Sequence, residues 1–299
     1  MKKTVILIVS VILICAVSVS FMINEHKFED SLESKEFLMI SEDMNRVLRC
    51  ELFDDNEIEQ IYFDGLKAEE YYSICSDSEG AIWVAVLQNG KIVLAKTVNY
   101  TVIQTISLNF APVKIAYYNN GIVASEINGN IYFIDVTTGE IDLLKHLSYT
   151  LDNASYCAGG FATDGTHLCW IDEESLSIMS NSEIKSYEVD YTTFLVFGGF
   201  YDEKFFFYHQ AYISEENYYL YSIDINTGKL LKILTDDRSM TDENFFIDEK
   251  QIVTFYDPES WTEKIYVRDL ETLKEKKAFV PNDLCGTMPQ FSPGKVVIL

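Results

Sequence analysis

The sequence predicts an all-β protein, a six-bladed β-propeller that follows an apolar N-terminal segment. Three observations support this fold class: many aromatic residues, short apolar runs separated by turn residues, and a repeat of about 44 residues. Aromatic residues form 14% of the 299 residues, including 19 Tyr and 19 Phe, and such side chains pack well on pleated surfaces. A repeat of this length holds four short strands, which is the content of one propeller blade.

The charge of the chain excludes one class of partner. Asp and Glu total 47 while Lys and Arg total 23, which gives a net charge of −24 at pH 7. Such a chain offers no basic surface to neutralise phosphate groups. We therefore expect no nucleic-acid partner.

Residues 1–22 form the first element and are expected to be a signal anchor. Lys2 and Lys3 precede an uncharged apolar run at residues 4–22, which as a helix would span roughly 28 Å, close to the hydrocarbon thickness of a bilayer. A cleaved signal peptide is the alternative, because Ala16 and Ser18 provide small residues for a cleavage site. The two lysines predict a cytoplasmic N-terminus with the remainder outside.

The predicted organisation is a signal anchor or signal peptide at residues 1–22, a linker at 23–35 and the propeller at 36–299. It is typical of an exported bacterial protein, held at the cell membrane by a single span with the domain outside, or secreted if the signal is cleaved. Without residues 1–22, which contain two lysines and no acidic residue, the chain has a charge of −26. An anionic membrane surface repels such a domain, so membrane contact is expected through residues 1–22 only.

Five cysteines follow this segment, and we interpret them as small core residues rather than a disulfide framework. Their number is odd, and they are spread through apolar segments. They are Cys50, Cys75, Cys157, Cys169 and Cys285.

Three segments of the repeat share an apolar residue, a tyrosine and, three positions after the tyrosine, an aspartate. They are Ile131–Asp135, Leu220–Asp224 and Ile265–Asp269. The first two continue to Gly139 and Gly228. An Asp carboxylate can accept hydrogen bonds from turn amides, and Gly can adopt a positive φ. Each segment is therefore predicted to be a strand followed by a tight turn and a second strand.

Equivalent positions define six copies of the repeat. They are Ser41, Lys96, Asp135, Ser180, Asp224 and Asp269. Ser41 and Lys96 lie 55 residues apart, and we attribute this longer interval to an insertion at residues 55–72, either a helix or an extended loop. A second hairpin is expected between successive copies, and three of its turns are predicted at Asn119–Gly121, Asp164–Gly165 and Asp202–Glu203.

The two chain ends each lack one half of a blade. The chain begins with an outer hairpin at Phe37–Leu52 and ends with an inner hairpin at Phe291–Leu299. Joining them in one blade closes a ring of six and removes two open sheet edges. The alternative is an all-β sandwich whose hairpins are evenly spaced.

On these turn motifs the chain resembles, over residues 36–299, the TolB-like group of six-bladed propellers, and Asp224–Lys229 resembles a repeat of quinoprotein-type propellers. Quinoprotein repeats continue with a tryptophan, where this chain has Leu230, Leu231 and Lys232. The Gly-His and Trp-Asp pairs of WD-repeat propellers are also absent from the sequence. The resemblance implies a fold and assigns neither a redox cofactor nor an activity.

The sequence contains no metal-binding helix, no Cys-x-x-Cys pair, no Gly-x-Ser-x-Gly turn and no phosphate-binding loop,. We therefore assign no catalytic residue, no metal ligand and no cofactor, and we expect a binding module rather than an enzyme. The alternative is an enzyme that acts on glycans or peptides, with its site assembled at the propeller axis from distant repeats.

The candidate ligand-binding residues lie in long loops of the second half of the chain. These loops join hairpins, on the face where propellers usually bind ligands, and they combine acidic with aromatic residues. The candidates are Tyr212, Asp236, Asp237, Asp257, Glu259 and Trp261. Such a surface suits a basic peptide, a sugar or Ca²⁺, and the alternative is a set of solvated loops. The sequence thus predicts a membrane-tethered extracytoplasmic module that binds, or serves as a scaffold for, a protein, peptide or glycan of the cell envelope.

Overall fold

The computed structural model describes residues 36–41, 43–51, 59–151, 160–172, 175–188, 195–209, 218–235, 245–248, 251–254, 265–272, 275–279 and 296–298. The regular elements of these residues are β-strands, numbered β1 to β24. No helix among the described residues is long and apolar enough to cross a membrane. The predicted segments at residues 1–22 and 23–35 lie outside the described part of the chain.

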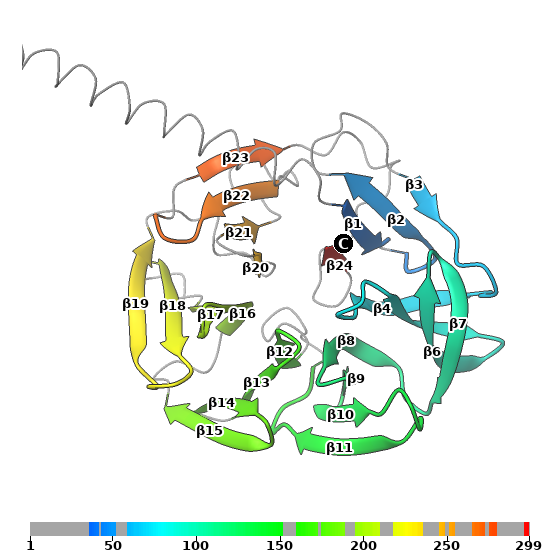
Figure 1. Ribbon diagram of the computed structural model, residues 1–299, viewed down its shortest axis with the longest axis horizontal. Coiled ribbons are helices and arrows are strands. Elements are labelled where there is room, and N and C mark those ends of the chain that lie inside the picture. The colour runs from blue at the N-terminus through cyan, green and yellow to red at the C-terminus, as the bar shows by residue number, and fades with distance from the viewer. Residues whose placement is uncertain are drawn as a thin grey trace, which may run out of the picture.

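The strands form six four-stranded antiparallel sheets in the described residues, and these sheets surround a common centre (Figure 1). From the centre outward, sheet A holds β24 (Val296–Ile298), β1 (Glu36–Ile40), β2 (Val47–Glu51) and β3 (Glu59–Ile61). Sheet B holds β4 (Glu70–Ser76), β5 (Ile82–Gln88), β6 (Lys91–Val98) and β7 (Thr101–Leu108). Sheet C holds β8 (Pro112–Tyr118), β9 (Gly121–Glu126), β10 (Asn130–Ile134) and β11 (Ile141–His146).

The remaining three sheets repeat this order. Sheet D holds β12 (Phe161–Thr163), β13 (His167–Asp172), β14 (Ser175–Ser180) and β15 (Glu183–Glu188). Sheet E holds β16 (Leu195–Tyr201), β17 (Lys204–His209), β18 (Tyr218–Asp224) and β19 (Leu230–Thr235). Sheet F holds β20 (Phe245–Asp248), β21 (Gln251–Thr254), β22 (Ile265–Asp269) and β23 (Glu275–Phe279).

The position of a strand within its sheet explains its hydrophobic pattern. In β5, the second strand from the centre, the side chains from Ile82 to Val86 are all buried, including Trp83 at 1% exposure. In the outermost strand β7, exposed residues alternate with more buried ones. Neighbouring sheets cover both faces of an inner strand, whereas an outer strand keeps one side in water. The core therefore lies between the sheets, where Trp83 and Leu94 of sheet B pack with Ile115 and Ile122 of sheet C.

The predicted aspartate turns are confirmed. The Asp135 carboxylate accepts hydrogen bonds from the amides of Thr137 and Thr138 at 2.7 and 2.9 Å. Asp224 accepts one from the Thr227 amide at 2.7 Å, and Asp269 accepts one from the Thr272 amide at 2.8 Å. Gly139 and Gly228 have φ values of 77° and 71°. Each turn connects the third and fourth strands of its sheet.

The predicted two-residue hairpin turns are confirmed as well. Asn119 and Asn120 have φ values of 47° and 62°, and Asp202 and Glu203 have values of 50° and 56°. Two consecutive positive φ angles define the type I′ turn, whose twist matches that of the strands it joins. Asn and Asp tolerate this conformation better than most residues.

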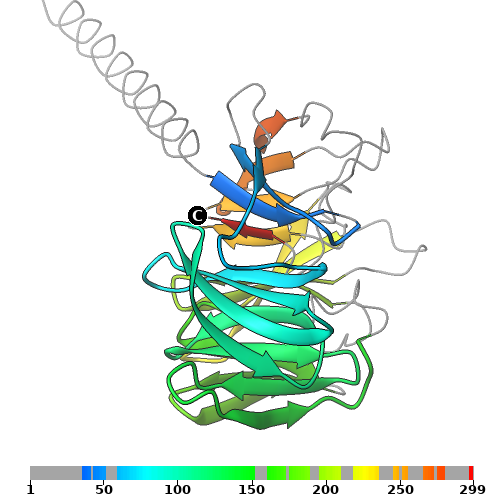
Figure 2. The same ribbon diagram turned by 90° about the vertical axis from the view of Figure 1, so that its right-hand side faces the viewer.

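The chain ends share sheet A, as the sequence predicts, but they divide it differently. β24 pairs with β1, and Leu38 lies opposite Val297; both views place β24 beside β1 (Figures 1 and 2). The N-terminal part supplies three strands and the described C-terminal residues supply one, instead of two from each end. β3 is only three residues long, and of these only Ile61 is buried. It therefore leaves little hydrophobic pattern in the sequence.

The predicted insertion at residues 55–72 is wrong within the described residues, where residues 59–61 belong to β3 and 70–72 to β4. Ser41 follows the second strand of its sheet, whereas Asp135 and Asp224 follow the third strands of theirs. The predicted alignment therefore placed the first copy one strand too early. The third strands β2 and β6 end at Glu51 and Val98, which lie 47 residues apart, so the interval needs no insertion.

Candidate functional site

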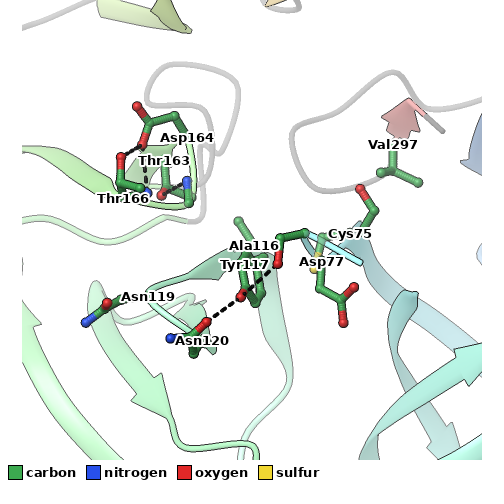
Figure 3. A pocket seen from close by; sticks show the side chains of 13 residues that line it. Cys75, Asp77, Ala116, Tyr117, Asn119, Asn120, Thr163, Asp164, Thr166 and Val297 are labelled. Carbon is green, nitrogen blue, oxygen red and sulfur yellow. Dashed lines mark hydrogen bonds between the residues drawn. The ribbon is translucent and has the colours of Figure 1, made fainter. Parts of the chain in front are cut away.

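A pocket of about 570 Å³ lies at the centre of the ring, between the inner strands of sheets A to D. Figure 3 shows Val297 of β24 on one side and the turn with Asp164 and Thr166 on the other, with Ala116 and Tyr117 of β8 between them. The wall consists of Cys75, Ser76, Asp77, Ser78, Ala116, Tyr117, Asn119, Asn120, Thr163, Asp164, Gly165, Thr166 and Val297.

Three turns in equivalent positions build most of this wall. Each turn connects the first and second strands of its sheet: residues 77–81 in sheet B, 119–120 in sheet C and 164–166 in sheet D. The inner strands carry these turns to the same end of the ring, so their side chains converge near the axis. The pocket therefore lies on the side of the turns within hairpins, whereas the sequence analysis expected a ligand on the side of the loops that join hairpins.

Asp77 closes the turn of sheet B. Its Oδ1 accepts hydrogen bonds from the amides of Glu79 at 3.0 Å and Ala81 at 2.9 Å. Its Oδ2 accepts a hydrogen bond from Trp83 Nε1 at 3.1 Å and forms an ion pair with Lys96 Nζ at 2.9 Å. Burial raises the pKa of Asp77, but the hydrogen bonds from Lys96 and Trp83 outweigh burial and hold the pKa below its ordinary value,.

Asp164 has the same role in sheet D. Its Oδ1 accepts hydrogen bonds from the Thr166 amide, the Thr166 hydroxyl and the His167 amide at 2.8, 2.9 and 2.7 Å. Its Oδ2 lies 2.9 Å from His167 Nδ1, whose ring stacks on Phe200 at 5.6 Å. Burial raises the pKa of Asp164, but the hydrogen bonds from His167 and Thr166 lower it below its ordinary value. The carboxylate is therefore ionised at neutral pH.

Tyr117 connects the turns across the pocket. Its hydroxyl accepts a hydrogen bond from Ser78 at 3.2 Å and donates one to Asn120 Oδ1 at 2.9 Å, as the dashed lines of Figure 3 show. The backbone N–H of Asn119 donates a hydrogen bond to the Gly165 carbonyl at 2.8 Å. These contacts hold the turns of sheets B, C and D in a fixed arrangement.

Some polar groups of the wall remain available to a ligand. Neither the Ser76 hydroxyl nor the Asn120 side-chain amide nitrogen forms a hydrogen bond to another described residue. The Cys75 thiol also faces this wall, and burial raises its pKa well above its ordinary value, so it is a neutral thiol rather than a nucleophilic thiolate at pH 7. Cys75 and Cys169 are free and buried, which confirms the interpretation of these two as core residues.

A buried lysine, Lys114, lies close to the pocket on β8, the strand that contributes Ala116 and Tyr117 to the wall. Lys114 precedes the wall residue Ala116 by two positions on β8, and its Nζ donates a hydrogen bond to the Phe161 carbonyl at 2.8 Å. The same Nζ lies 5.1 Å from the centre of the Phe161 ring. Burial lowers the pKa of Lys114 to about 8, because an ammonium loses hydration inside a protein. Lys114 belongs to the junction of sheets C and D and is not a wall residue.

The residues predicted as ligand contacts all lie outside the described residues: Tyr212, Asp236, Asp237, Asp257, Glu259 and Trp261. The pocket is made from other residues. The sequence analysis recognised two of its turns, Asn119–Gly121 and Asp164–Gly165, without identifying them as a site. The repeat offers a signal, because Asp77, Asn120 and Asp164 are spaced by about one period and equivalent turns of a ring face the same end of its axis.

Comparisons with known proteins identify the fold and no family. No protein-family model matches the chain, and no curated protein matches it in sequence. A chain in the crystal structure of a nidogen/laminin complex is similar in structure, with 12% identity and a TM-score of 0.55 over 89% of this chain and 98% of that one. The WD40 β-propeller domain of Doa1 has 10% identity and a TM-score of 0.54 over 83% and 80%.

A third similar structure is hydrazine synthase from Kuenenia stuttgartiensis, with 11% identity and a TM-score of 0.50 over 78% of this chain and 76% of that one. At these identities the likeness concerns the fold alone. The chain therefore has a fold of the β-propeller type, built from four-stranded antiparallel sheets.

Proposed function

We propose that this protein is a closed six-bladed propeller, of the TolB-like kind, which binds a ligand in the pocket at its axis. The six four-stranded sheets support six blades, and the pairing of β24 with β1 supports closure by the chain ends. The Asp-x-x-Thr turns after the third strands of sheets C, E and F support the relation to TolB-like propellers.

The observation that carries the proposal is the way the pocket wall is assembled. Four sheets contribute to it, and hydrogen bonds between Ser78, Tyr117 and Asn120 hold side chains from two sheets in place. A wall that is fixed before binding loses little conformational entropy when a ligand enters. Pockets of about 300–1,000 Å³ with an apolar lining and a few placed polar groups are the usual sites for small ligands.

We propose binding rather than catalysis at this pocket. Both wall carboxylates are engaged by their own turns, and the Cys75 thiol is protonated at neutral pH. A general base or a nucleophile requires a group that can accept a proton from a substrate or attack it. These three groups of the described wall do not meet that requirement.

The pocket proposal is tested by obstruction of its rim. Ser78 lies on the exposed rim, and its neighbour Glu79 belongs to the same turn but not to the wall. The full-length protein and its Ser78→Trp and Glu79→Trp variants are incubated with a small-molecule extract of the cell envelope, and retained compounds are identified by mass spectrometry. We expect compounds that the wild type and Glu79→Trp retain and Ser78→Trp does not. If retention is the same in both variants, the pocket is not the binding site.

We further propose that residues 1–22 tether the protein to the cell membrane with the propeller outside, where its partner is a component of the cell envelope. The apolar run after Lys2 and Lys3 supports this topology,. Protease added to intact cells should degrade the full-length chain and leave a cytoplasmic control protein intact. Protection of the chain in intact cells, with degradation only after lysis, would contradict it.

A further inference from the structure

The two carboxylates of the pocket wall, Asp77 and Asp164, already accept hydrogen bonds from groups of the protein itself. A carboxylate offers about four lone-pair positions. Asp77 uses four, to the amides of Glu79 and Ala81, to Trp83 Nε1 and to Lys96 Nζ. Its side chain is only 4% exposed. A cation that enters the pocket therefore finds no free acceptor on this carboxylate.

Asp164 is also engaged by its own turn, but its side chain is 30% exposed. It accepts three hydrogen bonds from Thr166 and His167 on Oδ1. Its Oδ2 contacts His167 Nδ1, which acts as the donor because an ionised carboxylate only accepts,. A cation at Asp164 would therefore have to share Oδ2 with His167, and it would gain one carboxylate oxygen as its ligand.

An anionic ligand is disfavoured for a different reason. Both carboxylates of the wall are ionised, since their pKa values lie below the ordinary range, and the whole chain has a net charge of −24. The Lys96 ammonium is engaged with Asp77 and lies 5.4 Å from the centre of the Trp83 ring. An anion would lose its hydration in this site without gaining a counter-charge.

The groups that remain are uncharged and polar. They include the hydroxyls of Ser76 and Ser78, the Asn120 amide and the Tyr117 hydroxyl, beside the apolar side chains of Ala116 and Val297. The Ser76 hydroxyl can both donate and accept, and the Asn120 amide nitrogen can donate. The Ser78 and Tyr117 hydroxyls already donate within the protein, so they can only accept from a ligand. The hydroxyl groups of a sugar suit all of these groups, because they both donate and accept. A sugar ring also presents C–H groups that can lie against apolar side chains.

We infer, on the basis of the binding function proposed above, that the axial pocket takes an uncharged, hydroxyl-rich ligand, a neutral sugar unit. Two consecutive hydrogen bonds, from Ser78 to Tyr117 and from Tyr117 to Asn120, orient the polar side of the pocket. Ala116 and Val297 provide its apolar side. Charged analogues are disfavoured, because the engaged carboxylates leave a cation little acceptor capacity and repel an anion.

The test compares three sugars that differ in charge: N-acetylglucosamine, which is neutral, glucosamine, which is cationic at pH 7, and glucuronic acid, which is anionic. Binding to the full-length protein is measured by saturation-transfer NMR, and the neutral sugar is expected to bind with a Kd on the order of 1 mM. The β-1,4-linked trimer of N-acetylglucosamine is also tested, to distinguish a free sugar from a glycan chain as the ligand. If the ligand is a glycan chain, the trimer should bind more tightly than the single sugar.

The matched variants are Tyr117→Phe and Tyr132→Phe. Both remove a hydroxyl that is hydrogen-bonded within the structure, but Tyr132 contacts Glu126 and Asn130 outside the pocket. Tyr117→Phe should raise the Kd for the neutral sugar about 3- to 10-fold, as expected for the loss of one hydrogen bond, and Tyr132→Phe should leave it unchanged.

Three results would overturn the inference: tighter binding of either charged sugar, no binding of any of the three, or equal effects of the two variants. These results are distinct from a failure of the binding function itself. If Ser78→Trp abolishes retention of charged compounds from the envelope extract, the pocket binds ligands but the ligand class is wrong. If neither experiment detects binding that depends on the pocket, both proposals fail.

Discussion

At the scale of single residues, the pocket depends on side chains that stabilise their own turns. Asp77 is the clearest case, because one carboxylate holds two backbone amides, the Trp83 indole and the Lys96 ammonium. A buried carboxylate with four donors stabilises the fold only while it is ionised. The same side chain therefore makes the stability of sheet B dependent on pH.

The first prediction concerns Asp77→Asn. The amide cannot form the ion pair with Lys96, so the free energy of unfolding should fall by about 2–3 kcal/mol at pH 7. Because the pKa of Asp77 is lowered in the folded state, its contribution is complete above about pH 4, the pKa of Asp in an unfolded chain, and is lost as the pH falls through the folded value. Urea denaturation between pH 7 and pH 2.5 should show a smaller pH dependence for Asp77→Asn than for the wild type.

The control for this prediction is Asp142→Asn, which removes a carboxylate from an exposed position on β11. Its unfolding free energy should stay within about 0.5 kcal/mol of the wild type at pH 7. Equal losses in the two variants would show that the contacts of Asp77 contribute nothing specific.

The second prediction concerns Lys114, whose pKa is lowered to about 8 by burial. Between about pH 8 and pH 10.4, the pKa of Lys in an unfolded chain, the unfolded state binds more protons at this site than the folded state. This group therefore makes the unfolding free energy rise with pH over that window. The buried thiols of Cys75 and Cys169 act in the opposite direction over this window, because burial raises their pKa values, so the contribution of Lys114 is measured as a difference. Denaturation from pH 7.5 to pH 9.5 should show the unfolding free energy of the wild type and of the exposed-site control Lys91→Met rising with pH relative to that of Lys114→Met.

At the scale of elements, turns set the geometry of each sheet. Gly121 follows the type I′ turn at Asn119–Asn120 and begins β9, where a Cβ atom would clash with the Phe133 ring of β10 and lie 2.8 Å from the Ile134 carbonyl oxygen. Glycine is required there by the close approach of the neighbouring strand.

The third prediction follows from this contact. Gly121→Ala should lower the free energy of unfolding by about 1–3 kcal/mol, because the new methyl group overpacks sheet C. Gly90→Ala is the comparison: its φ is +67°, but a Cβ would meet no atom within 4 Å, so the expected loss is only about 1 kcal/mol. Thermal denaturation of the two variants measures the difference. An equal or smaller loss for Gly121→Ala would contradict the predicted overpacking.

At the scale of the whole molecule, β24 has two roles. It covers the inner edge of β1 through the pairs Phe37–Ile298, Leu38–Val297 and Met39–Val296, and its Val297 forms part of the pocket wall. Because an uncovered strand edge pairs readily with other chains, β24 both protects the edge of β1 and contributes to the site.

The fourth prediction concerns a truncated chain that ends at Lys295 and so lacks β24. Loss of β24 should lower the melting temperature, promote aggregation visible by size-exclusion chromatography, and abolish retention of pocket ligands. Val297→Thr in the full-length chain should keep the pairing, because Thr is compatible with strands. A truncated chain that stays monomeric with an unchanged melting temperature would show that β24 does not stabilise sheet A.

Much of the architecture was predictable from local chemistry. Asp135, Asp224 and Asp269 marked turns because a carboxylate next to free amides favours the same turn wherever it occurs. Asn119–Asn120 marked a hairpin because Asn tolerates positive φ. Such signals act over a few residues, so they are readable along the chain. The division of sheet A between the chain ends was predicted only in part, because β3 buries one side chain of its three residues.

The sequence by itself determined where most of the described strands and turns fall, that the described part of the chain is all-β, and that strands from its two ends share one sheet, because these features depend on short-range hydrophobic periodicity and turn conformation. Only the tertiary structure decided which turns meet. Asp77, Tyr117 and Asp164 belong to different sheets, and the arrangement of those sheets around one centre brings them to a common pocket. It also decided that both wall carboxylates are engaged by donors of their own sheets, since the positions of those donors are fixed by folded geometry rather than by composition.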